Sequence, residues 1–299
     1  MSPLITSGAA TAIAPSAGSP LIQIRDLIYR TAGIFQADNK LRLLQDRCNK
    51  HMHALGLGSL REYHDCLVNK PMRNVELVSL LNEITIGETS FFRNRPQLDA
   101  IQKIVLPRIV EAKSAMRRPQ IRVWSAGCST GEEPYTLAMI LPEEMQRTLK
   151  GWKVEILATD LNERSLAQAK EGGYGDYSTR NLEPHFRNRY FTFQGNRLSV
   201  TPEVRSCVTF NRLNLLDDPR MMLIKQVDLI LCCNVLIYFD AASKKKAVGH
   251  FHNSLLPHGY LFLGHAESLF GVSDDFHLVH MPSTTAYIKR ESHAGDPPK

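Results

Sequence analysis

Val123-Trp-Ser-Ala-Gly-Cys-Ser-Thr-Gly-Glu-Glu-Pro-Tyr135 is the stretch that decides the fold of this chain. Apolar residues that predict a buried strand lead into a turn of small residues, which holds Gly127 and Gly131. Two acids follow and open a helical run. A strand, a glycine turn and a helix in this order are typical of an open α/β sheet that binds a nucleotide-like ligand.

The spacing of the two glycines indicates which ligand to expect. A dinucleotide pyrophosphate is usually held by three glycines in the pattern G-x-G-x-x-G, whose backbone N–H groups close on the phosphates. Here the pattern is G-x-x-x-G, and a carboxylate that would repel a phosphate stands at the start of the helix. S-adenosylmethionine fits this pattern better, because it carries hydroxyls and a positive charge but no phosphate.

The N-terminal part of the chain is predicted to be helical. Apolar periodicity through residues 21–85 predicts a small all-α domain, and Ser59-Leu-Arg-Glu62 matches a capping box at a helix start. Residues 86–120 are expected to form a linker and a long helix. Both ends of the chain, residues 1–20 and 291–299, are expected to be disordered tails.

From residue 121 onward the pattern changes to alternating strands and helices. This alternation predicts a doubly wound, Rossmann-like α/β domain with a parallel sheet over residues 121–290, of the S-adenosylmethionine-dependent methyltransferase type. At about residues 174–212 the alternation breaks, which predicts an inserted antiparallel β subdomain with a turn at Gly195-Asn196. Its expected strands are Tyr190-Phe-Thr-Phe193, Arg197-Leu-Ser-Val200 and Cys207-Val-Thr-Phe210.

Composition and charge exclude several classes of protein. With 43% hydrophobic and 22% charged residues, the chain reads as an ordinary soluble globular protein, and no apolar run reaches the ~18–20 residues that span a bilayer. The six cysteines form no C-x-x-C pair, which predicts reduced thiols and no metal site. Residues 1–120 hold 16 Lys and Arg against 10 Asp and Glu, so the whole net charge of +6 lies before the glycine turn. This excess indicates either an acidic partner or a solvated basic surface.

Two further motifs could hold parts of the cofactor. Asp160 closes the second predicted strand, where an acid holds a ribose diol in doubly wound folds. The alternative is that Asp160 caps the next helix. Asn214-Leu215 fits the slot where an amide pairs with an adenine edge and an aliphatic side chain packs on its face, although an ordinary turn at a strand end would look the same.

Two aromatic motifs could serve the methyl acceptor. Asn234-Val-Leu-Ile-Tyr-Phe239 follows the strand at 227–232 and lacks the proline pair of enzymes that methylate exocyclic or amide nitrogens. Tyr238 could face the transferred methyl group or be a core aromatic. In Thr89-Ser-Phe-Phe-Arg93, the arginine could hold a carboxylate of cofactor or substrate in bidentate fashion, or be a surface residue.

These motifs, together with Gly264-His-Ala-Glu-Ser268, resemble those of the chemotaxis receptor glutamate methyltransferases, the CheR family, in the same order over about residues 22–290. The resemblance implies S-adenosylmethionine as cofactor and S-adenosylhomocysteine as product. Two positions depart from the family pattern: Gly87 stands where Asn is frequent, and Cys233 stands where Arg is usual. The implied cofactor contacts are Thr89, Arg93, Glu133, Asp160, Asn214, Leu215, Asn234 and Val235, to which the glycine turn adds Gly127.

The resemblance also implies a reaction and a partner. A cytoplasmic enzyme of this family methylates glutamate carboxylates on the cytoplasmic helices of membrane chemoreceptors, forming methyl esters in chemotaxis adaptation. Arg93 and Tyr238 would orient the carboxylate, which is already ionised at pH 7 and needs no general base. The short loop Gln194-Gly-Asn-Arg197 implies an enzyme that does not dock on a receptor's C-terminal pentapeptide.

Other activities stay open at this point. The chain could bind S-adenosylmethionine as a sensor without turnover, or methylate RNA or a small molecule. The basic N-terminal part would allow RNA, but no aromatic and basic recognition motif accompanies it, so neither nucleic acid nor membrane insertion is expected.

Overall fold

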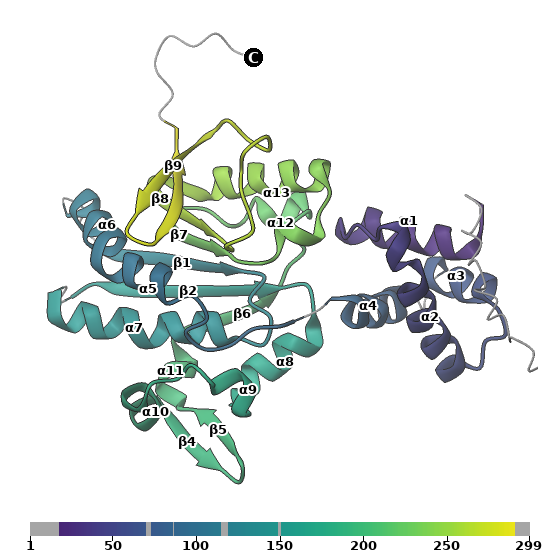
Figure 1. Ribbon diagram of the computed structural model, residues 1–299, viewed down its shortest axis with the longest axis horizontal. Coiled ribbons are helices and arrows are strands. Elements are labelled where there is room, and N and C mark those ends of the chain that lie inside the picture. The colour runs from purple at the N-terminus through teal and green to yellow at the C-terminus, as the bar shows by residue number, and fades with distance from the viewer. Residues whose placement is uncertain (1–17, 70–72, 86, 115–118, 149–150, 291–299) are drawn as a thin grey trace, which may run out of the picture. The chain divides into compact units, whose positions relative to one another are not determined.

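The computed structural model divides the chain into two compact units (Figure 1). The first, here called the helical unit, comprises residues up to Thr31 and Phe35–Leu80, and the second, the sheet unit, comprises Ala32–Ile34 and Leu81–Lys299. The structure describes residues 18–69, 73–85, 87–114, 119–148 and 151–290. The two predicted tails therefore lie outside the described residues, except for residues 18–20, where Pro20 already begins a helix.

The helical unit is all α, as predicted. Its helices are α1 (Pro20–Ala32), α2 (Leu41–Leu55), α3 (Leu60–Val68) and α4 (Arg73–Ile84), whose last turn belongs to the sheet unit. The predicted capping box is confirmed, because the Ser59 hydroxyl accepts the N–H of Glu62 at 3.3 Å. The carboxylate of Glu62 reaches back one residue further than expected and accepts the N–H of Gly58 at 2.8 Å.

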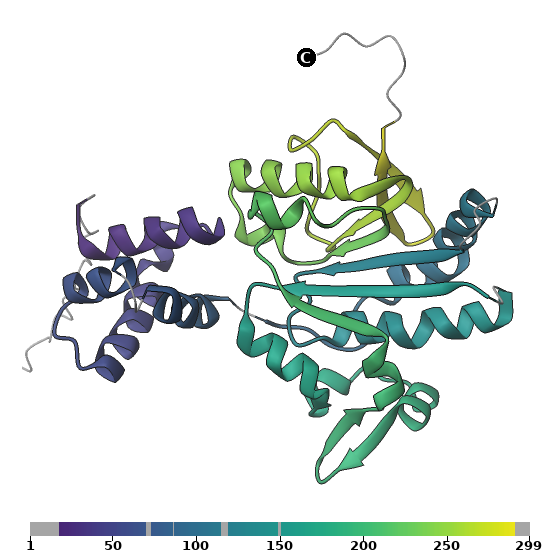
Figure 2. The same ribbon diagram turned by 180° about the vertical axis from the view of Figure 1, so that it is seen from behind.

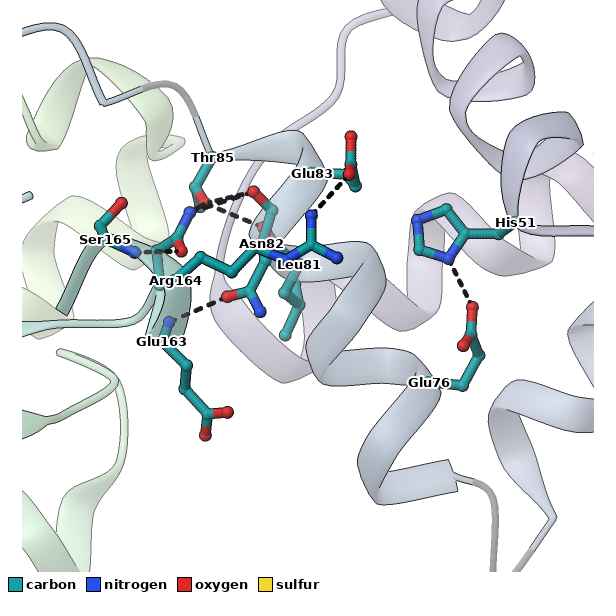
Figure 3. A network of polar contacts seen from close by, with 10 residues as sticks. His51, Glu76, Leu81, Asn82, Glu83, Thr85, Glu163, Arg164 and Ser165 are labelled. Carbon is teal, nitrogen blue, oxygen red and sulfur yellow. Dashed lines mark hydrogen bonds and ion pairs between the residues drawn. The ribbon is translucent and has the colours of Figure 1, made fainter. Parts of the chain in front are cut away.

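A buried polar trio ties three helices of the helical unit together. The carboxylate of Glu76 on α4 lies 2.6 Å from His51 Nδ1 on α2 (Figure 3). The same carboxylate accepts the hydroxyl of Tyr63 on α3 at 2.8 Å. Burial raises the pKa of Tyr63, so its hydroxyl stays protonated and donates. Each polar group in this apolar interior therefore has a partner, which buried polar groups need.

The sheet unit contains a seven-stranded sheet in the order β6-β2-β1-β7-β8-β10-β9. All neighbouring strands are parallel except β10, which runs antiparallel to both β8 and β9. The predicted doubly wound α/β architecture is thereby confirmed. The strands are β1 (Gln120–Ala126), β2 (Lys153–Asp160), β6 (Val208–Arg212), β7 (Val227–Cys232), β8 (Leu255–Leu263), β9 (Phe276–Met281) and β10 (Thr284–Lys289).

Helices cover both faces of this sheet (Figure 1, and from behind in Figure 2). Alternation along β1 directs Val123 into one apolar cluster and Trp124 into the other, so both faces are buried. The first face packs against α5 (Arg95–Ala100), a π-helical turn (Ile101–Val105), α6 (Leu106–Lys113), α7 (Glu132–Thr148) and α8 (Glu163–Glu171). The second face packs against α12 (Asp218–Met221) and α13 (Ala241–Ser254).

The antiparallel β subdomain is present, but one of its predicted strands was wrong. β4 (Phe191–Gln194) and β5 (Arg197–Val200) form the expected hairpin around Gly195-Asn196. The run at 207–210 instead forms β6, which pairs in parallel with β2 at the edge of the main sheet. Val208 and Phe210 are buried while their neighbours are exposed, and such alternation is the same for either strand direction. The third strand is β3, which has only two residues, Gly173–Tyr174; the short helices α9 (Asp176–Thr179), α10 (Pro184–Tyr190) and α11 (Pro202–Ser206) surround this sheet.

A buried ion cluster joins the amino ends of the central strands. Asp228 on β7 is fully buried, and its carboxylate accepts Lys113 Nζ at 2.8 and 3.0 Å and the backbone N–H of Arg122 at 2.8 Å. His258 Nε2 on β8 lies 2.8 Å from the same carboxylate. Asp228 thus joins α6, β1, β7 and β8 at the amino ends of the strands. Ligands bind at the opposite, carboxyl ends in this architecture.

We expect Asp228→Ala to lower the free energy of unfolding of the sheet unit by about 3–5 kcal/mol, because it leaves the buried Lys113 ammonium without its partner. Both tryptophans lie in this unit, so urea unfolding followed by their fluorescence reports on it. Glu155→Ala is the matched control, because its pairs with Arg122 and Lys153 are half-exposed and should contribute less than about 1 kcal/mol. Equal losses in the two variants would contradict a stabilising role for the cluster.

Candidate active site

A cavity of about 970 Å³ opens at the carboxyl ends of the parallel strands. Its walls come from the segments that follow β1, β2, β6, β7 and β8, together with residues that precede α5. This is where doubly wound sheets bind their ligands, and the volume is at the upper end of the roughly 300–1,000 Å³ common for small-molecule sites. The cavity is lined by all the site residues predicted from the sequence: Thr89, Arg93, Gly127, Glu133, Asp160, Asn214, Leu215, Asn234, Val235 and Tyr238.

The glycine turn folds over the end of β2. The N–H groups of Gly127 and Cys128 both donate to the carbonyl of Thr159, at 2.8 and 2.9 Å. Gly127 has a φ of 83°, and a Cβ there would lie 2.3 Å from the Val235 side chain. Both the backbone conformation and the packing therefore require glycine at this position.

Asp160 lies at the cavity wall and fixes the backbone on both sides of itself. One carboxylate oxygen accepts the N–H of Ser129 at 2.7 Å, and the other accepts the N–H of Asn162 at 2.8 Å. Burial raises the pKa of Asp160, and these backbone hydrogen bonds oppose that shift. The side chain that caps α8 is Asn162, so the alternative in which Asp160 is the helix cap is wrong. A carboxylate has about four acceptor positions, more than these backbone groups occupy, so Asp160 can also accept a hydroxyl of a ligand.

The two acids of the turn have different surroundings. Glu132 is 1% exposed, and its carboxylate accepts the Thr130 hydroxyl at 2.6 Å. Glu133 lines the cavity and accepts the Ser125 hydroxyl at 2.6 Å. Burial raises the pKa of Glu133, while its hydrogen bonds and the charge of Arg93 act in the opposite direction. Glu133 is thus the acid of the turn that can meet a cationic ligand inside the cavity.

The end of β6 supplies an amide and an aliphatic side chain. Oδ1 of Asn214 accepts the N–H of Leu216 at 3.0 Å, and the Asn214 carbonyl accepts the N–H of Asp217 at 3.0 Å. These bonds fix the orientation of the Asn214 amide at the cavity wall. Leu215 is buried beside it and presents an apolar surface of the kind that a base can stack on.

The loop after β7 is held by an acid that the sequence analysis did not single out. Asn234 has a φ of 62°, and its N–H donates to Glu267 at 2.7 Å. The same carboxylate accepts the N–H groups of Gly264 at 2.7 Å and Ile237 at 3.2 Å. Glu267 therefore joins the loops after β7 and β8, and its only sequence signal was its place in the motif that follows β8. Tyr238 lies in the 3₁₀ turn of this loop, and burial raises its pKa, so it is a neutral phenol.

Two buried aromatics anchor the segment that brings Thr89 and Arg93 to the cavity. The N–H of Phe91 donates to the carbonyl of Ser178 at 2.9 Å, and the N–H of Phe92 donates to the Thr136 hydroxyl at 3.3 Å. The Arg93 guanidinium is exposed at the wall and donates to the carbonyl of Glu88 at 2.8 Å. Phe91 and Phe92 therefore anchor the segment whose polar residues, Thr89 and Arg93, line the cavity.

The two departures from the family pattern both lie at this cavity. A Cβ on Gly87 would lie 2.6 Å from the hydroxyl of Ser129, so a larger residue there requires Ser129 to move. Cys233 contacts Gln97 Oε1 at 3.6 Å, and burial raises the pKa of its thiol well above the ordinary value. A small neutral group therefore stands where the family usually carries a cation.

A doubly wound sheet whose ligand edge carries a glycine turn and acids, without the three-glycine phosphate pattern, defines an S-adenosylmethionine-dependent methyltransferase. Residues 87–285 match the family model described as the S-adenosylmethionine-binding domain of CheR methyltransferases. Residues 20–85 match the model of their all-α domain. The chain therefore belongs to the CheR methyltransferase family.

Curated relatives match most of the chain. The chain is 37% identical over 259 residues to chemotaxis protein methyltransferase 1 of Pseudomonas aeruginosa. This match covers 85% of the chain and 92% of the relative. It is 34% identical over 252 residues to the chemotaxis protein methyltransferase of Borreliella burgdorferi, covering 84% and 88%. A third relative, chemotaxis protein methyltransferase 2 of Vibrio cholerae, is 33% identical over 268 residues, covering 89% and 91%.

The described residues show neither a membrane-crossing helix nor a metal-binding cluster. Among the described residues, every helix is too short or too polar to cross a bilayer. The same residues hold no group of three or more His, Cys, Asp or Glu side chains placed to bind a metal ion. All six cysteines are free thiols.

We expect the raised pKa of Glu133 to make the affinity for a cationic cofactor depend on pH. A cationic group binds the ionised carboxylate, so affinity is present above the raised pKa and is lost as the pH falls through it, at a higher pH than for a solvated glutamate. We expect calorimetric titrations with S-adenosylmethionine to show this loss together with proton release on binding. Glu133→Gln should bind more weakly at neutral pH and vary less with pH. An unchanged pH dependence in this variant would exclude Glu133 as the acid that meets the cation.

Proposed function

We propose that this protein transfers the methyl group of S-adenosylmethionine to glutamate side chains of chemoreceptors, forming methyl esters in the cytoplasm. The family and its chemotaxis relatives support the reaction class. The observation that supports a carboxylate acceptor is the position of Arg93. Its guanidinium is exposed on the wall of the same cavity that Glu133 and Tyr238 line.

The cofactor would be held by groups of matching chemistry. The carboxylate of Asp160 suits the two ribose hydroxyls, and Asn214 with Leu215 suits the edge and the face of an adenine ring. Glu133 suits the amino group, and Thr89, Gly127, Asn234 and Val235 complete the wall. When bound, the cofactor supplies an electrophilic methyl group on a sulfonium, which leaves as the neutral thioether of S-adenosylhomocysteine.

The acceptor carboxylate would be oriented by Arg93 through charge and by the Tyr238 hydroxyl through a hydrogen bond. A glutamate side chain is ionised at neutral pH, so neither residue needs to remove a proton. Their contribution is to hold an oxygen in line with the methyl carbon and to exclude water. Near-attack geometry of this kind can lower a barrier by on the order of 7–11 kcal/mol.

The contrast of charge within the cavity supports an acidic acceptor. The proposed cofactor side of the cavity is lined by three acids, Glu133, Asp160 and Glu267. The cation Arg93 lies instead on an exposed wall. The basic excess of residues 1–120 has the sign that would attract the acidic helices of a receptor and raise the rate of encounter. The tight two-residue turn at Gly195-Asn196 favours an enzyme that does not dock on the receptor's C-terminal pentapeptide.

The test is methyl transfer from radiolabelled cofactor to membranes that carry the receptors of the same organism, with and without their C-terminal pentapeptide. We expect base-labile label on protein, at equal rates on the two receptor forms. Arg93→Ala should lower kcat/KM for receptor by roughly a hundredfold, because the carboxylate loses its alignment. Tyr238→Phe should lower it by about tenfold, since it removes a single hydrogen bond.

Arg95→Ala is the matched control. Arg95 is two residues from Arg93 and similarly exposed, but it does not line the cavity, and neither do its ion-pair partners Asp99 and Glu183. Normal transfer by Arg93→Ala would remove Arg93 from the acceptor site. Base-stable label, or label on RNA, would overturn the proposed acceptor.

A further inference from the structure

Asn162 lies two residues after Asp160, and both polar atoms of its side chain form hydrogen bonds. It is 6% exposed, and its Oδ1 accepts the N–H of Ser165 at 3.0 Å, which caps α8. Its Nδ2 donates to the carbonyl of Asn82 at 3.0 Å and to the hydroxyl of Thr85 at 2.7 Å. The oxygen of the Asn162 amide faces a backbone N–H, and its nitrogen faces a backbone carbonyl. The orientation of the amide is therefore determined.

Neighbouring bonds strengthen this junction between the end of α4 and the start of α8 (Figure 3). The N–H of Glu163 donates to the Asn82 side chain at 2.9 Å. Arg164 pairs with Glu83 at 2.7 Å, but this pair is partly exposed and contributes less than a buried bond. Asn162 is thus the buried centre of the junction, and Arg164 lies at its solvent side.

The junction continues directly into the cofactor site. The backbone N–H of Asn162 donates to the Asp160 carboxylate at 2.8 Å. The other oxygen of that carboxylate accepts the N–H of Ser129, whose hydroxyl donates to the carbonyl of Gly87 at 3.2 Å. Hydrogen bonds therefore run from Thr85 and Asn82 through Asn162 and Asp160 to the glycine turn, and from there back to Gly87.

We infer that Asn162 is a positioning residue that couples the Asp160 carboxylate to residues 82–85. The inference rests on the proposed role of Asp160 in binding the ribose. A ligand that fixes Asp160 also favours the bonded state of Asn162, and the coupling is reciprocal, because linkage between two sites acts equally in both directions. Cofactor binding and the ordering of residues 82–85 consequently stabilise each other. Residues 82–85, which precede Thr89 and Arg93 in the chain, can thereby respond to the cofactor.

The experiment compares two variants that break the same bonds from opposite sides. Asn162→Ser keeps an oxygen that can cap α8 but loses both donors to residues 82–85. Thr85→Val keeps the shape of the side chain and removes the acceptor of one of them. We expect each variant to raise the Kd for S-adenosylhomocysteine by about three- to tenfold in calorimetry, and the double variant to be no weaker than Asn162→Ser alone.

Hydrogen exchange supplies the reciprocal readout. In the wild-type protein, S-adenosylhomocysteine should slow amide exchange at residues 82–85, and in Asn162→Ser this protection should be absent. The KM for receptor should change less than the Kd for the cofactor product in both variants. Arg164→Ala is the control, because it breaks the ion pair at the same junction without contacting Asp160, and its Kd should be unchanged.

Unchanged affinity and unchanged ligand protection in either folded variant would overturn the coupling. Additive losses in the double variant would also overturn it, since they would mean that the two residues act separately. Failure of the proposed function has a different signature, namely that the wild-type protein does not methylate receptors, which these ligand titrations do not measure.

Discussion

The carboxylate of Asp160 is the constraint on which the rest of the site depends. It joins the turn after β1, through the N–H of Ser129, to the start of α8, through the N–H of Asn162. Two strands can then end side by side with their loops fixed instead of mobile. The loops after β7 and β8 are joined in the same way by Glu267. Asp160 and Glu267 therefore fix the loops around the cavity by accepting backbone N–H groups, and the apolar core packs beneath these loops.

The same arrangement explains why the site of this protein suits a sulfonium cofactor and not a dinucleotide. Burial raises the pKa values of Asp160 and Glu133, yet both carboxylates keep hydrogen-bond donors that favour the ionised state. Anionic groups at a turn that would otherwise face phosphates select against phosphate and for hydroxyl and ammonium groups. The guanidinium of Arg93 supplies the opposite charge at an exposed wall, where an acceptor carboxylate can reach it. On the proposed function, the cavity would separate a cationic cofactor from an anionic acceptor.

Local chemistry could be predicted from the sequence, and contacts between distant segments could not. The glycine turn, the acid that closes β2 and the Ser59 cap depend on residues a few positions apart, so the sequence analysis identified them. The direction of β6 depends on its partner β2, some fifty residues earlier, and alternation of buried residues does not reveal it. Glu267 and Asn162 act on segments 33 and 80 positions away, so their bonding partners could not be read from the sequence, although Glu267 stands in a motif that the sequence does show.

The role of Asp160 in holding the cofactor is tested by the affinity of Asp160→Ala for S-adenosylmethionine, measured by calorimetry on protein whose tryptophan fluorescence shows it to be folded. We expect the Kd to rise by roughly a hundredfold or more, because the hydrogen bonds from the cofactor's ribose hydroxyls to the charged Asp160 carboxylate are lost. Glu163→Ala, which removes an exposed acid three residues further on, should bind as the wild type does. A folded Asp160→Ala protein that binds within about threefold of the wild type would rule out Asp160 as the group that holds the cofactor.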